Sequence, residues 1–164
     1  MKISNEYAAG FFDADGAVYA ARRTSRKGNS SPTLLVCCTQ AEREPGVCPE
    51  VLVRHHSQWG GSIAKKKMSA KNRRDQWQWV LAPKNAVDFL IDILPYTIVK
   101  TAVIQKSLEF AQLQSLPLRQ RINTKTKCVR PEHAERVWRV HAEICELNKR
   151  GQPFNALRKW DKCA

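Results

Sequence analysis

Four short stretches of the chain alternate between apolar and polar residues or collect apolar ones, as strands with a buried face do. In the first stretch, Val18 and Ala20 share one side, while Tyr19, Ala21 and Arg23 share the other. Short turns join the stretches in pairs, and strands paired in this way form an antiparallel sheet. The predicted strands cover residues 17–26, 33–40, 62–68 and 76–81.

Stretches with helical character surround these strands. The first has Ser4 or Asn5 as a cap and Glu6 in its first turn, where a negative charge favours the helix dipole. The second begins after Pro49 and stops at the glycine pair 60–61. The predicted helices cover residues 4–13, 51–59, 85–94, 97–114 and 132–149, with a turn or two more at 154–160 and a basic loop at 116–130.

The order of these elements is α-β-β-α-β-β-α-α with a helical tail. It predicts an α+β fold with an αββαββα core, in which an antiparallel sheet has helices on one face. The 164 residues suit a single domain with a sizeable core. We expect that core at about residues 4–114 and a helical C-terminal extension at about 115–164.

Basic side chains concentrate in the predicted sheet and loops. The chain has 28 Lys and Arg against 15 Asp and Glu, and this excess favours a polyanionic partner because neutralising phosphates releases counterions. Acids collect near the predicted helices instead. We therefore expect the sheet to face nucleic acid, with a ribosomal or otherwise basic housekeeping protein as the plainer alternative. The basic stretches without any acid are residues 16–41, 54–74 and 115–130.

The six cysteines form no C-x-x-C pair, so zinc-ribbon spacing is absent. Cys128, His133, His141 and Cys145 are conceivable ligands, but a buried helix face explains their spacing better, and we expect reduced thiols. No apolar run approaches the roughly 18 residues of a membrane span, and Glu6 interrupts any signal-peptide core. We expect an intracellular protein, cytoplasmic in a prokaryote or organellar, neither secreted nor in a membrane.

Residues 9–16, AGFFDADG, break two local rules at once. Gly10 within a helix costs about 1 kcal/mol relative to Ala, and with Ala9 and Ala14 it offers a smooth stripe for close approach of a second helix. Asp13 and Asp15 crowd the helix C-terminus, where the dipole is already negative. A divalent cation would resolve that conflict, because hard cations take carboxylate and carbonyl oxygens.

The stretch 7–16, YAAGFFDADG, resembles the motif of the LAGLIDADG homing endonucleases. Residues 89–100, FLIDILPYTIVK, are similar to the segment that leads to that family's active-site lysine, and Gln40 closes the second predicted strand. The resemblance covers residues 5 to about 114. No motif is recognised in residues 115–164.

The resemblance implies a fold and an activity. Single-motif members of the family are homodimers that bind double-stranded DNA on a saddle-shaped sheet. We therefore expect a site-specific double-strand DNA endonuclease, intron- or intein-borne, that hydrolyses phosphodiester bonds at a long pseudo-palindromic target. An RNA maturase that binds its intron RNA, and a DNA-binding regulator that does not cut, are the alternatives on the same fold.

The resemblance also implies site residues. Asp15 would bind a divalent metal, Mg²⁺ or Mn²⁺, with the carbonyl of Ala14 as a further ligand. Gln40 and Lys100 match the peripheral polar positions of the catalytic site, and Arg43 is a weaker candidate because acids flank it. Each has an ordinary alternative: a solvated helix end, a strand-ending polar residue or a surface lysine. The dimer interface would include Ala9, Gly10 and Asp13.

Alternation along the strands assigns the side chains that would face DNA. The third strand admits two registers, Lys65 with Lys67 or Ala64 with Lys66, and in the fourth strand Trp77 and Trp79 are expected to face the helices. The expected DNA contacts are Tyr19, Ala21, Arg23, Ser25, Arg26, Lys27, Thr33, Leu35, Cys37, Lys65, Lys66, Lys67, Lys71, Arg73, Arg74, Gln76 and Gln78.

Overall fold

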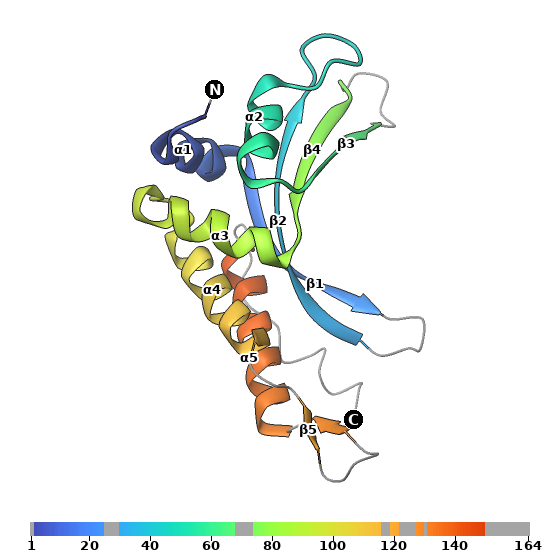
Figure 1. Cartoon of the computed structure of the whole chain (residues 1–164), viewed down its shortest axis with the longest axis vertical. Helices are drawn as coiled ribbons and strands as arrows, with labels where there is room; N and C mark the ends of the chain where they lie inside the picture. Colours follow the sequence, from blue (N-terminus) through green and yellow to red (C-terminus); the bar gives the residue numbers. More distant parts are fainter. Residues whose placement is uncertain are drawn as a thin grey trace.

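One antiparallel sheet organises the chain (Figure 1). A computed structural model describes residues 2–24, 30–67, 74–115, 119–121, 127–129 and 131–149. The strand order is β1-β2-β4-β3, so β1 and β3 are the edges. The strands are β1 (Gly16–Thr24), β2 (Ser30–Ala41), β3 (Ser62–Lys66) and β4 (Gln76–Leu81).

Helices cover one face of this sheet, and the β1–β2 hairpin bends away from them toward its tip (Figure 1). A short hairpin, β5 (Arg119–Arg121) with β6 (Lys127–Val129), precedes the last helix. Within the described part of the chain, no helix is both long and apolar enough to cross a membrane. The helices are α1 (Asn5–Asp15), α2 (Glu50–Trp59), α3 (Pro83–Ile93), the 3-10 turn η1 (Leu94–Tyr96), α4 (Thr101–Ser115) and α5 (Pro131–Leu147).

The predicted α+β fold and the αββαββα order are confirmed. Several boundaries differ from the prediction. Helix α1 continues to Asp15, α4 begins at Thr101 instead of residue 97, and part of the predicted loop at 116–130 pairs as the hairpin β5–β6. The later start of α4 has a local cause, because Pro95 lies in the preceding 3-10 turn and the next residues are held by another helix, as described below. The predicted turns at 154–160 lie outside the described residues.

The core lies between the sheet and the helices, as the alternation predicts. Val18 of β1 and Leu34 and Val36 of β2 are buried against it. In β4, Trp79 and Leu81 are fully buried, and Trp77 packs partly against the same core, so the predicted inward orientation of both tryptophans is confirmed.

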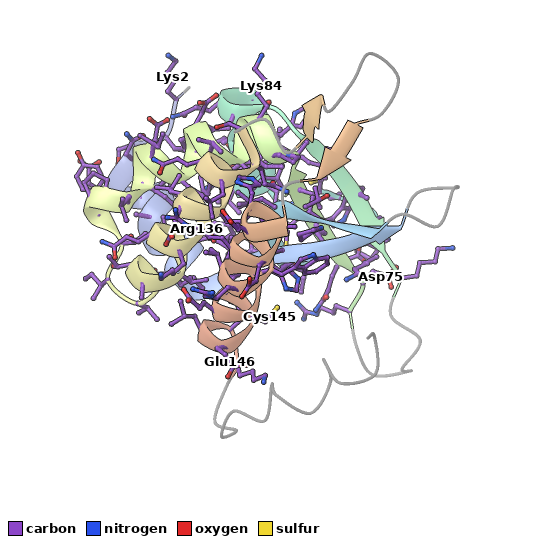
Figure 2. All side chains as sticks on the ribbon, turned by 90° about the horizontal axis from the view of Figure 1, so that it is seen from below. Lys2, Asp75, Lys84, Arg136, Cys145 and Glu146 are labelled. Carbon is purple, nitrogen blue, oxygen red and sulfur yellow. The ribbon has the colours of Figure 1, made fainter. Side chains whose placement is uncertain are left out.

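Helix α5 closes the outer edge of the sheet at β1. The Nε2 atom of His141 lies 3.0 Å from the carbonyl oxygen of Ala20, and Asn148 Nδ2 donates to the carbonyl of Val18 at 2.6 Å. An unpaired edge strand exposes a row of backbone groups, and these two side chains satisfy part of that row. Figure 2, in which Arg136, Cys145 and Glu146 are labelled, shows α5 lying across the β1 side of the sheet. Helix α5 therefore packs on the same sheet as the rest of the core.

A buried histidine sits in the aromatic part of the core. His55 of α2 is fully buried, with its ring centroid 5.2 Å from Phe11, 5.5 Å from Trp59 and 5.1 Å from Trp79. Its Nδ1 lies 2.7 Å from the carbonyl oxygen of Val51, while Nε2 has no hydrogen-bond partner among the described residues. Burial lowers the pKa of His55, and the bond to Val51 opposes that shift only in part.

We expect His55 to make the fold sensitive to mild acid. Its folded-state pKa lies below the unfolded value of about 6.5, so below that pH the unfolded chain binds a proton that the folded chain rejects, and stability falls as the pH falls. Urea unfolding from pH 7.5 to 5.5 should show a smaller loss for His55→Phe than for the wild type. The exposed His56→Gln is the matched control and should behave like the wild type. Parallel pH profiles for the wild type and His55→Phe would contradict the assignment.

Candidate active site

Helix α1 carries the candidate site at its C-terminal end. Its N-terminus is capped by Ser4, whose Oγ accepts the backbone N–H of Tyr7 at 3.2 Å. Ala8, Ala9 and Phe12 are fully buried in the core. The opposite side is exposed, and a Cβ added at Gly10 would meet no heavy atom within 4 Å. The last residue of the helix, Asp15, is exposed.

The two acids of the motif point in different directions. Residues two apart on a helix are separated by about 200°, so Asp13 turns toward the start of α4. Its carboxylate accepts the backbone N–H groups of Ile98, Val99 and Lys100 at 2.7, 3.1 and 3.0 Å. Hydrogen bonds from backbone amides to a carboxylate are strong, so Asp13 fixes the turn before α4. Asp15 is left to face solvent.

The Lys100 side chain, in turn, binds the end of α1. Its Nζ donates to the carbonyl oxygen of Phe12 at 2.8 Å and to that of Asp13, and it lies 5.6 Å from the centroid of the Phe12 ring. These carbonyls belong to the last turn of α1, where a cation is favoured by the helix dipole. We call the two reciprocal sets of bonds the Asp13–Lys100 clamp.

Asp15 and Lys100 lie close to the buried thiol of Cys38. Burial raises the pKa of Cys38, the charges of Cys37 and Asp15 raise it further, and the charge of Lys100 opposes them. In the register of β1 with β2, Gly16 is opposite Cys38. Gln40 lies two residues further along the same face of β2, about 7 Å from Cys38 at the usual rise of a strand. The structure therefore brings the sequence-predicted residues Asp15, Lys100 and Gln40 to one end of α1.

Gly16 allows this end of the helix to fit against the sheet. Its backbone φ of −84° is ordinary, so the glycine is not required for its conformation. A Cβ at this position would overlap the ring of Phe12, which is fully buried. The close approach of α1 to the first residue of β1 thus depends on the missing side chain.

The donor set at this end suits a hard cation. The exposed carboxylate of Asp15 and the carbonyl of Ala14, in a last turn that lacks helical N–H partners, are both oxygen ligands. Among the described residues, no group of three or more His, Cys, Asp and Glu side chains could hold a metal within one chain.

The sheet face turned away from the helices is the candidate DNA surface, which we call the open face. Paired residues share a face, so Tyr19 with Leu35 and Ala21 with Thr33 lie together on it, as predicted. Gln78 of β4 donates to Thr39 of β2 at 3.2 Å across it. The described members of the open face include Ala17, Tyr19, Ala21, Thr33, Leu35, Cys37, Thr39, Ala41, Ser62, Ala64, Lys66, Gln76, Gln78 and Val80.

Solved structures resemble this chain over nearly its full length, although neither a protein-family model nor a curated protein matches its sequence. The archaeal intron-encoded homing endonuclease I-Vdi141I, complexed with DNA, matches with a TM-score of 0.65 and 19% identity over 94% of this chain and 89% of that one. The homing endonuclease I-CvuI, in complex with its target, matches with a TM-score of 0.62 and 17% identity over 92% and 85%. The I-SmaMI LAGLIDADG homing endonuclease, bound to cleaved DNA, matches with a TM-score of 0.63 and 14% identity over 99% of this chain and 49% of its own.

The chain has the LAGLIDADG homing-endonuclease fold. In that fold the motif of residues 7–16 occupies α1, and the open face is formed by both strand pairs. The chain spans about half the length of I-SmaMI but most of the length of I-CvuI.

Within this homing-endonuclease fold, one of the residues expected at a dimer interface faces inward and another is half-buried. Ala9 is fully buried in its own core, and the carboxylate of Asp13 is held by the clamp. They lie one turn apart on the inner flank of α1, whereas Gly10 is exposed together with Tyr7 and Ala14. The expectation for Ala9 is therefore corrected, the one for Asp13 stays a prediction, and the exposed stripe runs through Gly10.

The register of β3, which the sequence left open, is set by its pairing with β4. Lys66 is opposite Gln76 and Ala64 is opposite Gln78, so both belong to the open face. Lys65 points to the helix side and binds Glu42 at 2.9 Å and Asp75 at 3.1 Å. Hydrogen bonds to these two carboxylates raise the pKa of Lys65. The expectation that Lys65 contacts DNA is replaced by a structural ion pair.

The remaining predicted DNA contacts are exposed, partly buried or outside the described residues. Lys67 and Arg74 are exposed. Ser25, Arg26, Lys27, Lys71 and Arg73, and the side chain of Arg23, lie outside the described residues. Tyr19 donates to the Cys37 sulfur at 3.4 Å, and burial, followed by Cys37, raises the pKa of Tyr19 to about 12.

Thr39 of the open face and Asn148 near the site were not predicted. The alternation that selected residues 33, 35 and 37 continues to Thr39, so that signal was present in the sequence. The position of Asn148 could not be predicted from the sequence pattern, because it depends on where α5 packs. It lines a cleft of about 450 Å³ between β1, the start of α4 and the end of α5, and Lys100 lines the same cleft.

The adjacent lysines of β3 should separate DNA contact from stability. Lys66→Gln should weaken binding to duplex DNA and reduce the slope of log affinity against log salt by about one, with little change in melting temperature. Lys65→Gln should lower the melting temperature because Glu42 and Asp75 lose their cation, and it should keep the salt slope. Binding titrations at several salt concentrations, with thermal melts, measure both. The reverse pattern would place Lys65 at the DNA.

Proposed function

We propose that this protein is a homodimeric, site-specific double-strand DNA endonuclease of the LAGLIDADG homing-endonuclease family. The observation that carries the proposal is the exposed Asp15 at the end of α1, with Lys100 and Gln40 beside it and the open sheet face adjoining it. The similarity to solved homing endonucleases that hold DNA supports it. The excess of basic over acidic residues, 28 against 15, fits a DNA partner.

The proposal includes a divalent cation, Mg²⁺ or Mn²⁺, held by Asp15 and the carbonyl of Ala14. A cation there would supply charge stabilisation to the phosphate and the leaving oxygen. The chain contributes the rest. Asp15 keeps its carboxylate free for that purpose because Asp13 takes over the backbone amides of residues 98–100.

Lys100 and Gln40 have distinct roles in this proposal. Lys100 is already anchored on the final carbonyls of α1, so its ammonium lies where negative charge develops at a phosphate beside Asp15. Gln40, on the other flank of α1, is placed to orient a water molecule with its amide. Arg43 lines the same groove as Gln40 and is exposed, so it is a candidate phosphate contact.

Two copies are needed because one chain supplies one Asp15. Each copy would hydrolyse one strand, and a two-fold dimer would prefer a pseudo-palindromic target. An origin in an intron or intein belongs to the same proposal, and intron RNA is a second candidate partner.

The two motif aspartates test the proposal. A duplex DNA library with a randomised target region is incubated with Mg²⁺, and the new ends are sequenced. The wild type should produce paired breaks at related sequences. Asp15→Asn should produce none, yet still retain DNA and melt like the wild type, because the Asp15 side chain is exposed at the end of α1. Asp13→Asn should still cut, with stability lowered by about 1–3 kcal/mol through weaker charge-assisted bonds to residues 98–100.

The same experiment separates the alternatives. A wild type that enriches DNA sequences without breaking them would be a binding protein that does not cut. Enrichment of RNA but not DNA would indicate a maturase. A stably folded Asp13→Asn without activity, next to an active Asp15→Asn, would overturn the assignment of the metal-binding carboxylate.

A further inference from the structure

Arg43 lies just beyond the end of β2, between the two acids Glu42 and Glu44. An adjacent carboxylate that paired with the guanidinium would compete with a phosphate for it. The structure shows that the two acids differ. Glu44 is exposed, whereas Glu42 is only 9% exposed and points to the helix side of the sheet. Its carboxylate must therefore have partners within the fold.

Three groups hold Glu42. The Lys65 ammonium lies 2.9 Å from its carboxylate, and the backbone N–H of Gly46 donates to the same oxygen at 3.0 Å. The backbone N–H of Glu42 donates to the carbonyl oxygen of Asp75 at 2.9 Å, which extends the pairing of β2 with β4 by one residue. The bond from Lys65, followed by the bond from Gly46, lowers the pKa of Glu42, so the carboxylate stays ionised.

Lys65 joins Glu42 to the other strands at this end of the sheet. Its ammonium also lies 3.1 Å from the Asp75 carboxylate. The side chains of Glu42, Lys65 and Asp75 are 11%, 29% and 27% exposed, so water screens their charges less than it screens an ordinary surface pair. We call these three residues the Glu42–Lys65–Asp75 network.

The bond to Gly46 closes a turn around Arg43. A second bond, from the N–H of Val47 to the carbonyl oxygen of Glu44 at 3.1 Å, lies within the same loop. The φ of Gly46 is +82°, in the left-handed region that glycine adopts without steric cost. The backbone of residues 42–46 is thus fixed although the loop is exposed, and Arg43 lines the same groove as Gln40.

We propose that Glu42 is a positioning residue, which holds Arg43 beside Gln40 and leaves its guanidinium available to a phosphate. The inference rests on the proposed nuclease function and adds a residue to it. Glu42 is not on the open face, and it acts through Arg43. Because its carboxylate is already bound to Lys65 and Gly46, it fixes the turn without neutralising the arginine.

The same network links the DNA surface to the site. Lys65 and Asp75 each precede a residue of the open face, Lys66 and Gln76, which are opposite one another in the sheet. A displacement of either strand end moves a charge of the network and so moves Glu42. None of the three network side chains is on the open face itself. Losses in the network should therefore lower the rate of cutting and leave the affinity for DNA unchanged.

The first test compares Glu42→Gln with Glu44→Gln, which removes the same charge from the other neighbour of Arg43. Single-turnover cleavage of a target recovered from the library is measured with Mg²⁺, and binding to that target is measured without it. Glu42→Gln should cut roughly 10- to 100-fold more slowly, because small misplacements near the reacting atoms cost this much, and it should bind like the wild type. Glu44→Gln should cut like the wild type. A wild-type rate for Glu42→Gln would overturn the proposal.

The pair Lys65→Gln and Lys106→Gln separates positioning from stability. Lys106 bridges Glu109 and Glu143 at 3.0 and 2.7 Å, as Lys65 bridges its own two acids, but it lies between α4 and α5. Both variants should lower the melting temperature. Only Lys65→Gln should slow cutting as Glu42→Gln does. Equal cutting rates for the two lysine variants would contradict the positioning role.

A double-mutant cycle shows whether Glu42 acts through Arg43. Arg43→Gln alone should slow cutting by a factor similar to that of Glu42→Gln. Combining the two should cause no further loss, because the residue that Glu42 positions is already gone. A full additional loss in the double variant, or an Arg43→Gln that cuts at the wild-type rate, would show that Glu42 does not work through Arg43.

Amide exchange in the free protein separates failure of the inference from failure of the proposed function. The N–H of Gly46 should exchange at least about tenfold faster in Glu42→Gln, because its bond to a charged acceptor is weakened, and Glu44→Gln should leave it unchanged. Unchanged exchange in Glu42→Gln would refute the network whether or not the protein cuts. If exchange responds as expected but the wild type cuts no member of the library, the network stands, while the nuclease assignment and the role of Glu42 in cutting both fall.

Discussion

The Asp13–Lys100 clamp is the constraint on which the rest of the site depends. Two helix ends that are each electrostatically incomplete satisfy one another: the Asp13 carboxylate takes three amides before α4, and the Lys100 ammonium takes carbonyls at the end of α1. Without Lys100, two acids would crowd the negative end of a helix dipole. The clamp therefore leaves the Asp15 carboxylate exposed beside Lys100 at the end of α1.

The clamp also gives two similar residues of the motif different structural roles. The Asp13 carboxylate is held in hydrogen bonds to the backbone before α4, whereas the Asp15 side chain is exposed. In β3 the same division recurs, since Lys65 pairs with Glu42 and Asp75 while Lys66 lies on the open face. In both cases the geometry of the element decides: 100° per residue in the helix, and alternate faces in the strand.

Much of this arrangement could be predicted from the sequence. Alternation placed Tyr19, Gln76 and Gln78 on one face and the tryptophans on the other, because periodicity is a local property. The inward turn of Ala9 and the start of α4 could not be predicted in this way. The bonds that hold Asp13 to residues 98–100 span 85 to 87 positions, and a local pattern contains no signal for them.

The same limit applies to the C-terminal helix. Its apolar positions predicted a buried face, and Val137, Val140 and Ile144 are buried. That His141 and Asn148 close the edge of β1 follows only from the packing of α5 on β1. His141 and Asn148 thus support the strand that begins directly at the candidate site.

The central claim is that each copy supplies one carboxylate for one DNA strand. Dimers that contain one wild-type copy and one Asp15→Asn copy, isolated through different affinity tags, test it most directly on a target recovered from the library. The account predicts that these mixed dimers nick a single strand, while wild-type dimers break both. Double-strand breaks made by the mixed dimers at the wild-type rate would contradict it.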